Sequence, residues 1–369
     1  MLAAAVDDVA NLSWGLPSFA TPEPIRQAVT RAFASDPDIG KYALPNGLPE
    51  LRSLVAEEHQ RKTGVRVDPD QNVFISAGNM QGMSTLLHVL LEPGDEIILT
   101  DPGFASHYEQ IRLHGGVPVG WRLDEESGWE MDTTLLETLI TDRTRAVVLV
   151  NPCNPTGNLF SKQKLLRLGE IAAARDLLLI IDDPYSELIY ADRERYFNLA
   201  AEPALRDRLA YLFTFSKIHA MSGWRLGYMI LPDWLRAQVL KVHDANLICA
   251  PRVSQSAGIA ALSGDQAHVR AFREILAKRR DLICERLDAL PHVFGYVRPE
   301  GAYYVFPRLL VEAEDSWSFS RRLLEETGVC VTPGIAFGAS SDGHVRMAFC
   351  VEEDVIDKAF DRITDRYPG

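Results

Sequence analysis

From residue 73 onward, short apolar runs alternate with patterns typical of helices. Continuous apolar runs of this length, bounded by turn residues, indicate buried strands. The expected strands are 73–76, 96–99, 146–150, 177–181 and 209–215, with 226–231 as a further candidate, and helical patterns at 81–91 and 162–175 lie between some of them. This alternation predicts an α/β protein with a mostly parallel sheet and helices on both faces, in which a ligand binds beyond the carboxyl ends of the strands.

The N-terminal part differs from this alternating region. Residues 1–20 show no helical periodicity and are expected to form an arm that crosses another surface. Thr21 is predicted to be the N-cap, and Pro22 the first residue, of a helix. The predicted apolar face of that helix carries Ile25, Val29, Ala32 and Phe33. A second helix is expected from residue 49 to about residue 62.

The C-terminal part is expected to be a second, smaller α+β unit. It begins with a long helical pattern at 265–290, continues with strands near 303–306 and 345–349, and closes with a helix near 352–367. We therefore predict an N-terminal arm and first helix at 1–44, a large domain at 45–275 and a small domain at 276–369. A length of 369 residues fits such a division, since it is too great for one ordinary core.

Composition argues against several classes of partner and location. The net charge is −13 without a basic tract, so no nucleic-acid partner is expected. The five cysteines are scattered without the spacing of a zinc site or a disulfide framework, so no metal is expected and a reducing cytosol fits. No stretch reaches membrane-spanning length, and the first eight residues lack the charged region of a signal peptide. A cytoplasmic protein without membrane contact is therefore expected.

The most informative stretch follows the strand predicted at 209–215. It brings Thr214, Ser216 and Lys217 into a turn, with Arg225 shortly after. Burial disfavours a charged ammonium, and a neutral lysine amine attacks carbonyl compounds and forms Schiff bases. The two hydroxyls and the guanidinium suit an anion held beside that amine. Pyridoxal phosphate carries both an aldehyde and a phosphate, which makes it the expected cofactor; the alternative is a surface lysine at a strand end.

With its companion motifs, this stretch resembles the lysine signature of the fold-type I pyridoxal-phosphate enzymes, the class I and II aminotransferases. The companions are NPCNPTG at 151–157, DDPY at 182–185 and HVRMAF at 344–349, and the resemblance runs from about Gly15 to Phe349. It implies an aspartate-aminotransferase-like fold with a seven-stranded type of sheet. It also implies transamination between an L-amino acid and a 2-oxo acid through a Lys217 Schiff base, with Lys217 as general base.

The resemblance also assigns cofactor contacts. Thr214, Ser216, Arg225 and the backbone of Asn79 and Met80 would hold the phosphate. Tyr42 would reach the phosphate of a neighbouring subunit, which implies a homodimer. Phe104 would stack on the pyridine ring, Asn154 and Tyr185 would contact its phenolic oxygen, and Asp182, rather than Asp183, would keep its nitrogen protonated. The matching Asn-Pro bond is often cis in the family. Phe104 and Tyr42 have a purely structural alternative, as packing aromatics.

For the substrate, the resemblance assigns Arg346 and Asn154, with the backbone of Gly15 lining the site. A guanidinium fork matches the α-carboxylate, although Arg346 could instead face solvent. Side-chain recognition stays open: Trp14, Leu16, Phe19 and Tyr303 could form an apolar pocket, and Arg252 could accept a carboxylate or be a solvated charge. A dicarboxylate donor is expected from the family. A C–S β-lyase or cyclase on the same fold is the main alternative; a regulator with an aminotransferase-like domain and a catalytically inactive relative are remote ones.

Overall fold

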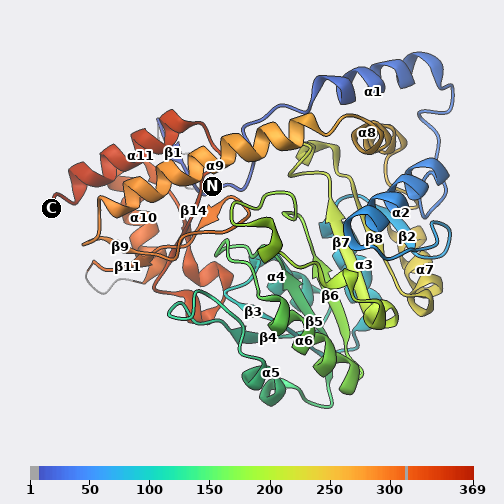
Figure 1. The fold of residues 1–369 in the computed structure, drawn as a ribbon, viewed down its shortest axis with the longest axis horizontal. Coiled ribbons are helices and arrows are strands. Elements are labelled where there is room, and N and C mark those ends of the chain that lie inside the picture. The colour runs from blue at the N-terminus through green and yellow to red at the C-terminus, as the bar shows by residue number, and fades with distance from the viewer. Residues whose placement is uncertain (1–7, 312–314) are drawn as a thin grey trace.

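The computed structural model describes residues 8–311 and 315–369, and its larger part is built around a seven-stranded sheet (Figure 1). In order across the sheet, the strands are β2 (Val73–Ser76), β8 (Gly227–Ile230), β7 (Leu209–Thr214), β6 (Leu178–Asp182), β5 (Thr144–Val150), β3 (Glu96–Asp101) and β4 (Val117–Arg122). β8 runs antiparallel to both of its neighbours, and the other adjacent strands are parallel. The predicted α/β architecture with a mostly parallel sheet is confirmed.

The strand β4 is the one member of this sheet that the sequence does not predict. It lies at the edge of the sheet beside β3. Val117 and Arg122 are exposed, and Trp121 is the one buried side chain of the strand. An edge strand of this kind carries no continuous apolar run. Such runs are the signal that predicts the other six strands of the sheet.

Helices cover both faces of the sheet, as the alternating pattern predicts. One face packs under α3 (Asn79–Leu90), α4 (Ala105–Leu113) and α7 (Arg236–Asn246). The other packs under α2 (Pro49–Thr63), α5 (Thr133–Leu139), α6 (Lys162–Ala174) and α8 (Arg252–Ser263). Side chains alternate between the faces: on β7, Ala210 and Leu212 join the first core, and Tyr211 and Phe213 the second.

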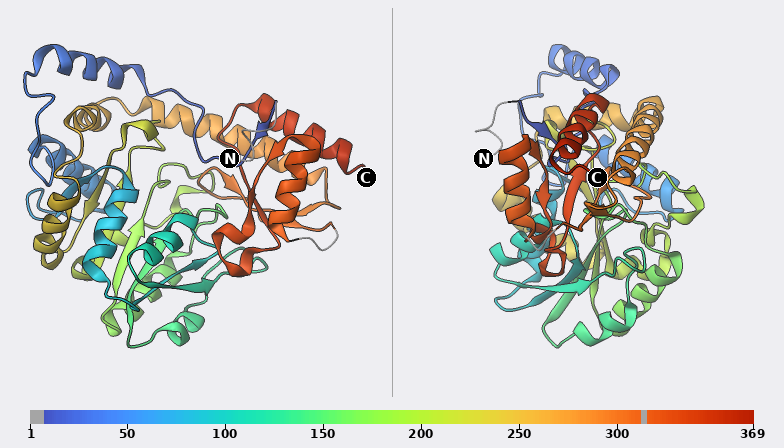
Figure 2. Two further views of the ribbon diagram at one scale, coloured as in Figure 1. Left: turned by 180° about the vertical axis from the view of Figure 1, so that it is seen from behind. Right: turned by 90° about the vertical axis from the view of Figure 1, so that its left-hand side faces the viewer.

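The smaller part lies at the C-terminal end of the chain and combines helices with short strands (Figure 2). Its helices are α9 (Ala267–Asp288), α10 (Ser316–Thr327) and α11 (Glu353–Arg366). Its antiparallel strands are β10 (Tyr304–Val305), β14 (Val345–Ala348) and β13 (Thr332–Pro333), and β9 (Phe294–Gly295) with β11 (Arg308–Leu309). The predicted boundary between residues 275 and 276 falls inside α9, which runs along both parts in Figure 1. The division into residues 1–44, 45–275 and 276–369 stays a prediction.

The N-terminal segment joins the two parts, and its first seven residues lie outside the described range. Residues 8–20 form no helix, as expected. The short strand β1 (Ala10–Asn11) pairs in parallel with β12 (Val329–Cys330) and lies beside α11 (Figure 2). Two further main-chain bonds hold the segment to the smaller part, from Ala348 N to Leu12 O (2.7 Å) and from Ser18 N to Cys350 O (2.9 Å). We call residues 8–21 the arm.

The helix α1 (Glu23–Ser35) corrects two predictions. Pro22 is the N-cap residue, and the Thr21 hydroxyl instead donates to the Ala220 carbonyl at 2.6 Å, so Thr21 is not the cap. Phe33 is 62% exposed, whereas Ile25 is buried. The buried stripe is narrower than predicted because α1 packs on α8 and not on the sheet (Figure 1).

No helix within the described residues is both long and apolar enough to cross a membrane.

Candidate active site

A cavity of about 170 Å³ opens at the carboxyl ends of the parallel strands. This is where doubly wound sheets bind ligands, because the loops after neighbouring strands converge there. Most of the predicted site residues line it: Asn79, Met80, Phe104, Asn154, Asp182, Tyr185, Thr214, Ser216, Lys217 and Arg225. His107 and Tyr304 also line it, and neither of them is predicted from the sequence. The cavity therefore unites motifs that span more than a hundred residues of chain.

The Lys217 amine contacts the arm. Its Nζ atom donates to the Gly15 carbonyl at 2.9 Å, and the Tyr303 hydroxyl donates to the same oxygen at 3.0 Å. A Cβ atom on Gly15 would lie 1.9 Å from the Tyr304 hydroxyl oxygen, so only glycine lets the arm approach this closely. The resemblance assigns Gly15 to the substrate site, and the structure brings its carbonyl into contact with Lys217.

One end of the cavity gathers donors for an anion. The hydroxyls of Thr214 and Ser216 are 2.9 Å apart, and the Arg225 guanidinium lies against Gly78, where a Cβ atom would come within 2.6 Å of it. Helix α3 begins at Asn79, directly after Gly78. The first N–H groups of a helix lack intrahelical acceptors and favour negative charge. Two hydroxyls, a guanidinium and a helix N-terminus fit a phosphate group.

The Asp182 carboxylate, at the end of β6, is buried and held from two sides. Its Oδ1 atom accepts a hydrogen bond from Asn79 Nδ2 at 2.6 Å, and its Oδ2 atom lies 3.3 Å from His107 Nε2. His107 also packs edge-on against Phe104, with ring centroids 5.1 Å apart. A carboxylate fixed in this way beside an aromatic side chain fits a protonated ring nitrogen. A lone histidine on a helix carries no motif, which is why the sequence did not reveal it.

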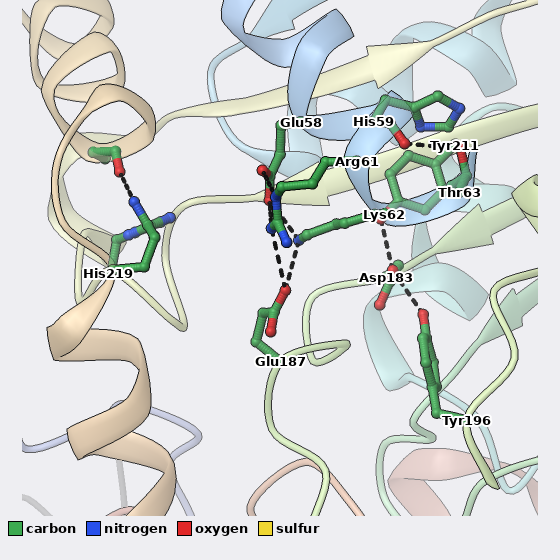
Figure 3. A network of polar contacts seen from close by, with 12 residues as sticks. Glu58, His59, Arg61, Lys62, Thr63, Asp183, Glu187, Tyr196, Tyr211 and His219 are labelled. Carbon is green, nitrogen blue, oxygen red and sulfur yellow. Dashed lines mark hydrogen bonds and ion pairs between the residues drawn. The ribbon is translucent and has the colours of Figure 1, made fainter. Parts of the chain in front are cut away.

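Asp183 faces the opposite way, into the core under α2 (Figure 3). Its Oδ2 atom accepts hydrogen bonds from the hydroxyls of Tyr211 (2.6 Å) and Tyr196 (3.0 Å). Complete burial raises the pKa of Asp183 from 3.8 to about 6, while the nearby Lys62 charge and the tyrosine hydrogen bonds oppose this shift. Of the two adjacent aspartates, Asp182 therefore lines the cavity and Asp183 does not.

Two tyrosines and Asn154 line the wall toward the smaller part. The hydroxyls of Tyr185 and Tyr304 are 3.2 Å apart, and burial, followed by the charge of Tyr304, raises the pKa of Tyr185 above its ordinary value. Asn154 accepts a hydrogen bond from Arg346 through Oδ1, so its amide nitrogen remains as a donor. The peptide bonds 151–152 and 154–155 are both cis, as the resemblance implies.

Arg346 is buried, so the alternative of a solvent-facing arginine on β14 is wrong. Its Nη1 atom donates to Asn154 Oδ1 at 3.1 Å and its Nη2 atom to the Ser13 carbonyl at 2.6 Å. The guanidinium also lies 4.4 Å from the Tyr304 ring centroid. Its Nε atom is buried and has no hydrogen-bond partner among the described residues. A buried guanidinium with an unused donor fits a carboxylate ligand.

The remaining candidates lie elsewhere. Tyr42 is 74% exposed and does not line the cavity of its own chain. Arg252, at the start of α8, pairs with Asp36 (Nε to Oδ2, 3.3 Å). Phe19 stacks on Phe272 with ring centroids 4.0 Å apart, so it packs against α9. Across residues 8–311 and 315–369, no group of three or more His, Cys, Asp or Glu side chains is arranged to hold a metal ion.

Comparisons with known proteins agree with this geometry. The family model "Aminotransferase class I and II" matches residues 7–363. The aspartate/prephenate aminotransferase of Thermus thermophilus is 36% identical over 361 residues, which cover 96% of this chain and 90% of that protein. The crystal structure of an aromatic aminotransferase from Pyrococcus horikoshii superimposes with a TM-score of 0.93 at 31% identity, covering 98% and 96% of the two chains.

A second solved structure, aspartate aminotransferase from Thermus thermophilus with maleate, has a TM-score of 0.90 at 34% identity and covers 97% of this chain and 91% of that one. Similarity of this extent includes both parts of the fold. The chain belongs to the class I and II aminotransferases, pyridoxal phosphate-dependent enzymes of fold type I that carry out amino-acid transamination.

Proposed function

We propose that this chain exchanges an amino group between an L-amino acid and a 2-oxo acid at the cavity described above, with Lys217 as the residue that couples to the cofactor. The observation that carries the proposal is the shared cavity of the Lys217 amine, the Asp182 carboxylate and the anion-binding group. An amine, a carboxylate and an anion site are what an aldehyde, a ring nitrogen and a phosphate on one molecule require.

Pyridoxal phosphate, when bound, supplies an aldehyde that couples to an amine and a ring that takes up the electron pair left by the departing α-proton. Thr214, Ser216 and Arg225 would hold its phosphate through two hydroxyls and a guanidinium. Phe104 would lie against the ring. Asp182 would keep a proton on the ring nitrogen, which requires that this carboxylate stay ionised.

Lys217 would also move the proton. When it is not coupled to the cofactor, the Lys217 amine would act as a general base toward the α-proton of the amino acid, and its conjugate acid would later give that proton up. The contact from Nζ to the Gly15 carbonyl supports this role, because it keeps the amine beside the cavity when nothing is coupled to it. Tyr185 and Asn154 would donate to the phenolic oxygen of the ring.

Arg346 would bind the α-carboxylate of the substrate. The buried Nε atom without a partner supports this assignment, since a bidentate carboxylate would satisfy it. Asn154 accepts from the same guanidinium and so links the carboxylate site to the cofactor site. We further propose a dicarboxylic amino acid as one donor, in line with the relative named for aspartate and prephenate and the neighbour solved with maleate.

We also propose that the enzyme works as a homodimer in the cytoplasm. Tyr42, Leu44 and Ile248 are large apolar side chains exposed to 74%, 53% and 38% in the single chain. Ala43 N donates to Cys249 Sγ at 3.3 Å, so the segments that carry these side chains lie side by side. Exposed apolar side chains in one region of a monomer mark an interaction surface, and a second copy would bring its Tyr42 to this phosphate site. The five scattered cysteines fit a reducing compartment.

The test is to mix the purified protein, loaded with pyridoxal phosphate, with single L-amino acids and no 2-oxo acid. Conversion of the bound cofactor to its amino form, with one equivalent of 2-oxo acid, is expected for an aminotransferase. Release of ammonia and pyruvate with recovery of the starting spectrum would instead indicate a β-lyase. Lys217→Ala should abolish both the lysine-bound absorption and turnover, and a variant that transaminates at the wild-type rate would refute the assignment of Lys217.

A further inference from the structure

The side chains of Asn79 and Asp182 form a short hydrogen bond in the cavity, and the family resemblance assigns no role to it. The family resemblance uses only the backbone of Asn79, as part of the anion site. In the structure the side-chain Nδ2 atom donates to Asp182 Oδ1 at 2.6 Å. The second neighbour of the carboxylate, His107 Nε2, is more distant at 3.3 Å. Asn79 is therefore the closer of the two donors that reach Asp182.

The backbone around Asn79 is shaped for this contact. Gly78 has a φ of +80°, and helix α3 begins with Asn79 itself. On the neighbouring strand β8, Gly227 leaves space: a Cβ atom there would lie 2.8 Å from Asn79 Oδ1. That oxygen is buried and has no hydrogen-bond partner among the described residues. An amide that leaves a buried oxygen unpaired while its nitrogen donates to a carboxylate is oriented for the donor contact.

We propose that Asn79 is a positioning residue whose amide keeps the Asp182 carboxylate ionised, so that a shared proton resides on the cofactor's ring nitrogen and not on Asp182. Hydrogen bonds donated to a carboxylate stabilise its charged form. Each carboxylate oxygen has two lone pairs, so the bond from Asn79 leaves Asp182 able to accept from the ring nitrogen as well. The inference rests on the proposed function, in which Asp182 keeps the ring nitrogen of the cofactor protonated.

Other charged or titratable groups surround the carboxylate and must be held constant in any test. Those that line the same cavity are His107, Tyr185, Lys217, Arg225 and Tyr304. None of them lies on α3, so a substitution of Asn79 changes the contact from that helix without removing any of these groups.

The experiment uses enzyme loaded with pyridoxal phosphate that carries ¹⁵N in its ring, and compares wild type, Asn79→Ala and Asn79→Asp by NMR and by pH–rate profiles. In Asn79→Ala the ring ¹⁵N resonance should move toward the unprotonated position, and kcat should fall about tenfold to a hundredfold, the effect of losing one hydrogen bond to a charged group. The KM of the amino donor should change little, because Arg346 binds its carboxylate.

Asn79→Asp gives a reading that loss of packing cannot produce. Two carboxyl groups this close share one proton at low pH, and the protonated member donates to the other as the amide did. Activity and the ring ¹⁵N shift should therefore approach wild type at low pH. As the pH rises and the second carboxyl ionises, the added negative charge should hold the ring proton to a higher pH than in Asn79→Ala, where no group replaces the amide. The isosteric change also serves if the alanine variant does not fold.

The matched control is Asn72→Ala, at the opposite end of β2. Asn72 is buried, more deeply than the half-buried Asn79, and it donates to the Leu231 carbonyl (2.9 Å) and to Asp233 (2.7 Å), away from the cavity. It should lose stability without any change in the ring ¹⁵N shift. Wild-type shifts and wild-type pH profiles in both Asn79 variants would overturn the inference alone. Wild-type protein that binds no pyridoxal phosphate would overturn the proposed function, and the inference with it.

Discussion

Asp183→Asn should gain stability relative to wild type as the pH rises. The quantity that changes is the difference between the two proteins in the free energy of unfolding. Asp183 is completely buried, and burial raises its pKa to about 6 from the ordinary value of 3.8. Asparagine has the same shape and keeps an oxygen that can accept from Tyr211 and Tyr196. It removes the carboxylate charge and replaces one carboxylate oxygen by an amide nitrogen.

The size of the effect follows from the difference between the two pKa values. Between about pH 4 and pH 6 the native protein holds a proton on Asp183 that the unfolded chain has released. The contribution of this group to stability is therefore fully present below pH 4 and is lost as the pH rises through 6. A difference of about two pKa units corresponds to about 3 kcal/mol in the free energy of unfolding. Asp183→Asn abolishes this loss.

The assay is urea-induced unfolding followed by circular dichroism, at a fixed protein concentration and with saturating pyridoxal phosphate, at pH 4.5 and pH 8. The new amide nitrogen occupies the place of Asp183 Oδ1, which has no partner among the described residues, and this adds an offset. The offset is the same at every pH, so the stability gained by the variant between pH 4.5 and pH 8 isolates the ionisation. Asp142→Asn, which removes an exposed carboxylate, is the control.

A stability difference between Asp183→Asn and wild type that does not change from pH 4.5 to pH 8 would refute the reasoning. It would mean that ionised Asp183 is as stable in the core as in the unfolded chain. In that case the nearby Lys62 and the two tyrosine hydroxyls would compensate the desolvation completely.

Three further predictions concern the cavity. Arg346→Lys should raise the KM of the amino donor about tenfold to a hundredfold in steady-state kinetics while leaving cofactor affinity unchanged, because a lysine cannot form the bidentate contact. Gly78→Ala should weaken pyridoxal-phosphate binding about tenfold in a fluorescence titration, since its Cβ atom would displace the Arg225 guanidinium and strain a φ of +80°. Tyr185→Phe should change the pH dependence of cofactor absorption, because it removes the hydroxyl that would donate to the phenolic oxygen of the ring and that lies 3.2 Å from the Tyr304 hydroxyl. An unchanged titration would exclude Tyr185 as a donor.

Most of the large sheet is predictable because its strands are buried on both faces. Six of the strands, such as β5 and β7, carry continuous apolar runs, and the motifs at their carboxyl ends converge on the cavity as the sheet geometry requires. The edge strand β4 escapes prediction because it lacks such a run. The Thr21 cap is wrong for a related reason: its hydroxyl is used by the turn after Lys217, a contact between segments nearly two hundred residues apart.

The site residues that were missed share one property. His107, Tyr304 and the side chain of Asn79 act through contacts with residues that are distant in sequence, and none belongs to a motif of its own. Sequence reasoning identifies chemistry that is written in adjacent residues, such as the lysine with its two hydroxyls. It does not identify which neighbour the fold will turn toward a carboxylate.

The arm reaches the site mainly through its main chain. Arg346 is bound by the carbonyl of Ser13 and Lys217 by the carbonyl of Gly15, and every residue carries a carbonyl. An alanine scan would therefore record Ser13 as dispensable although the segment contacts both Arg346 and Lys217. Shortening the arm by one residue would move each carbonyl out of reach while leaving the other side chains of the cavity intact. Deletion and insertion, more than substitution, are the perturbations to which this part of the enzyme is sensitive.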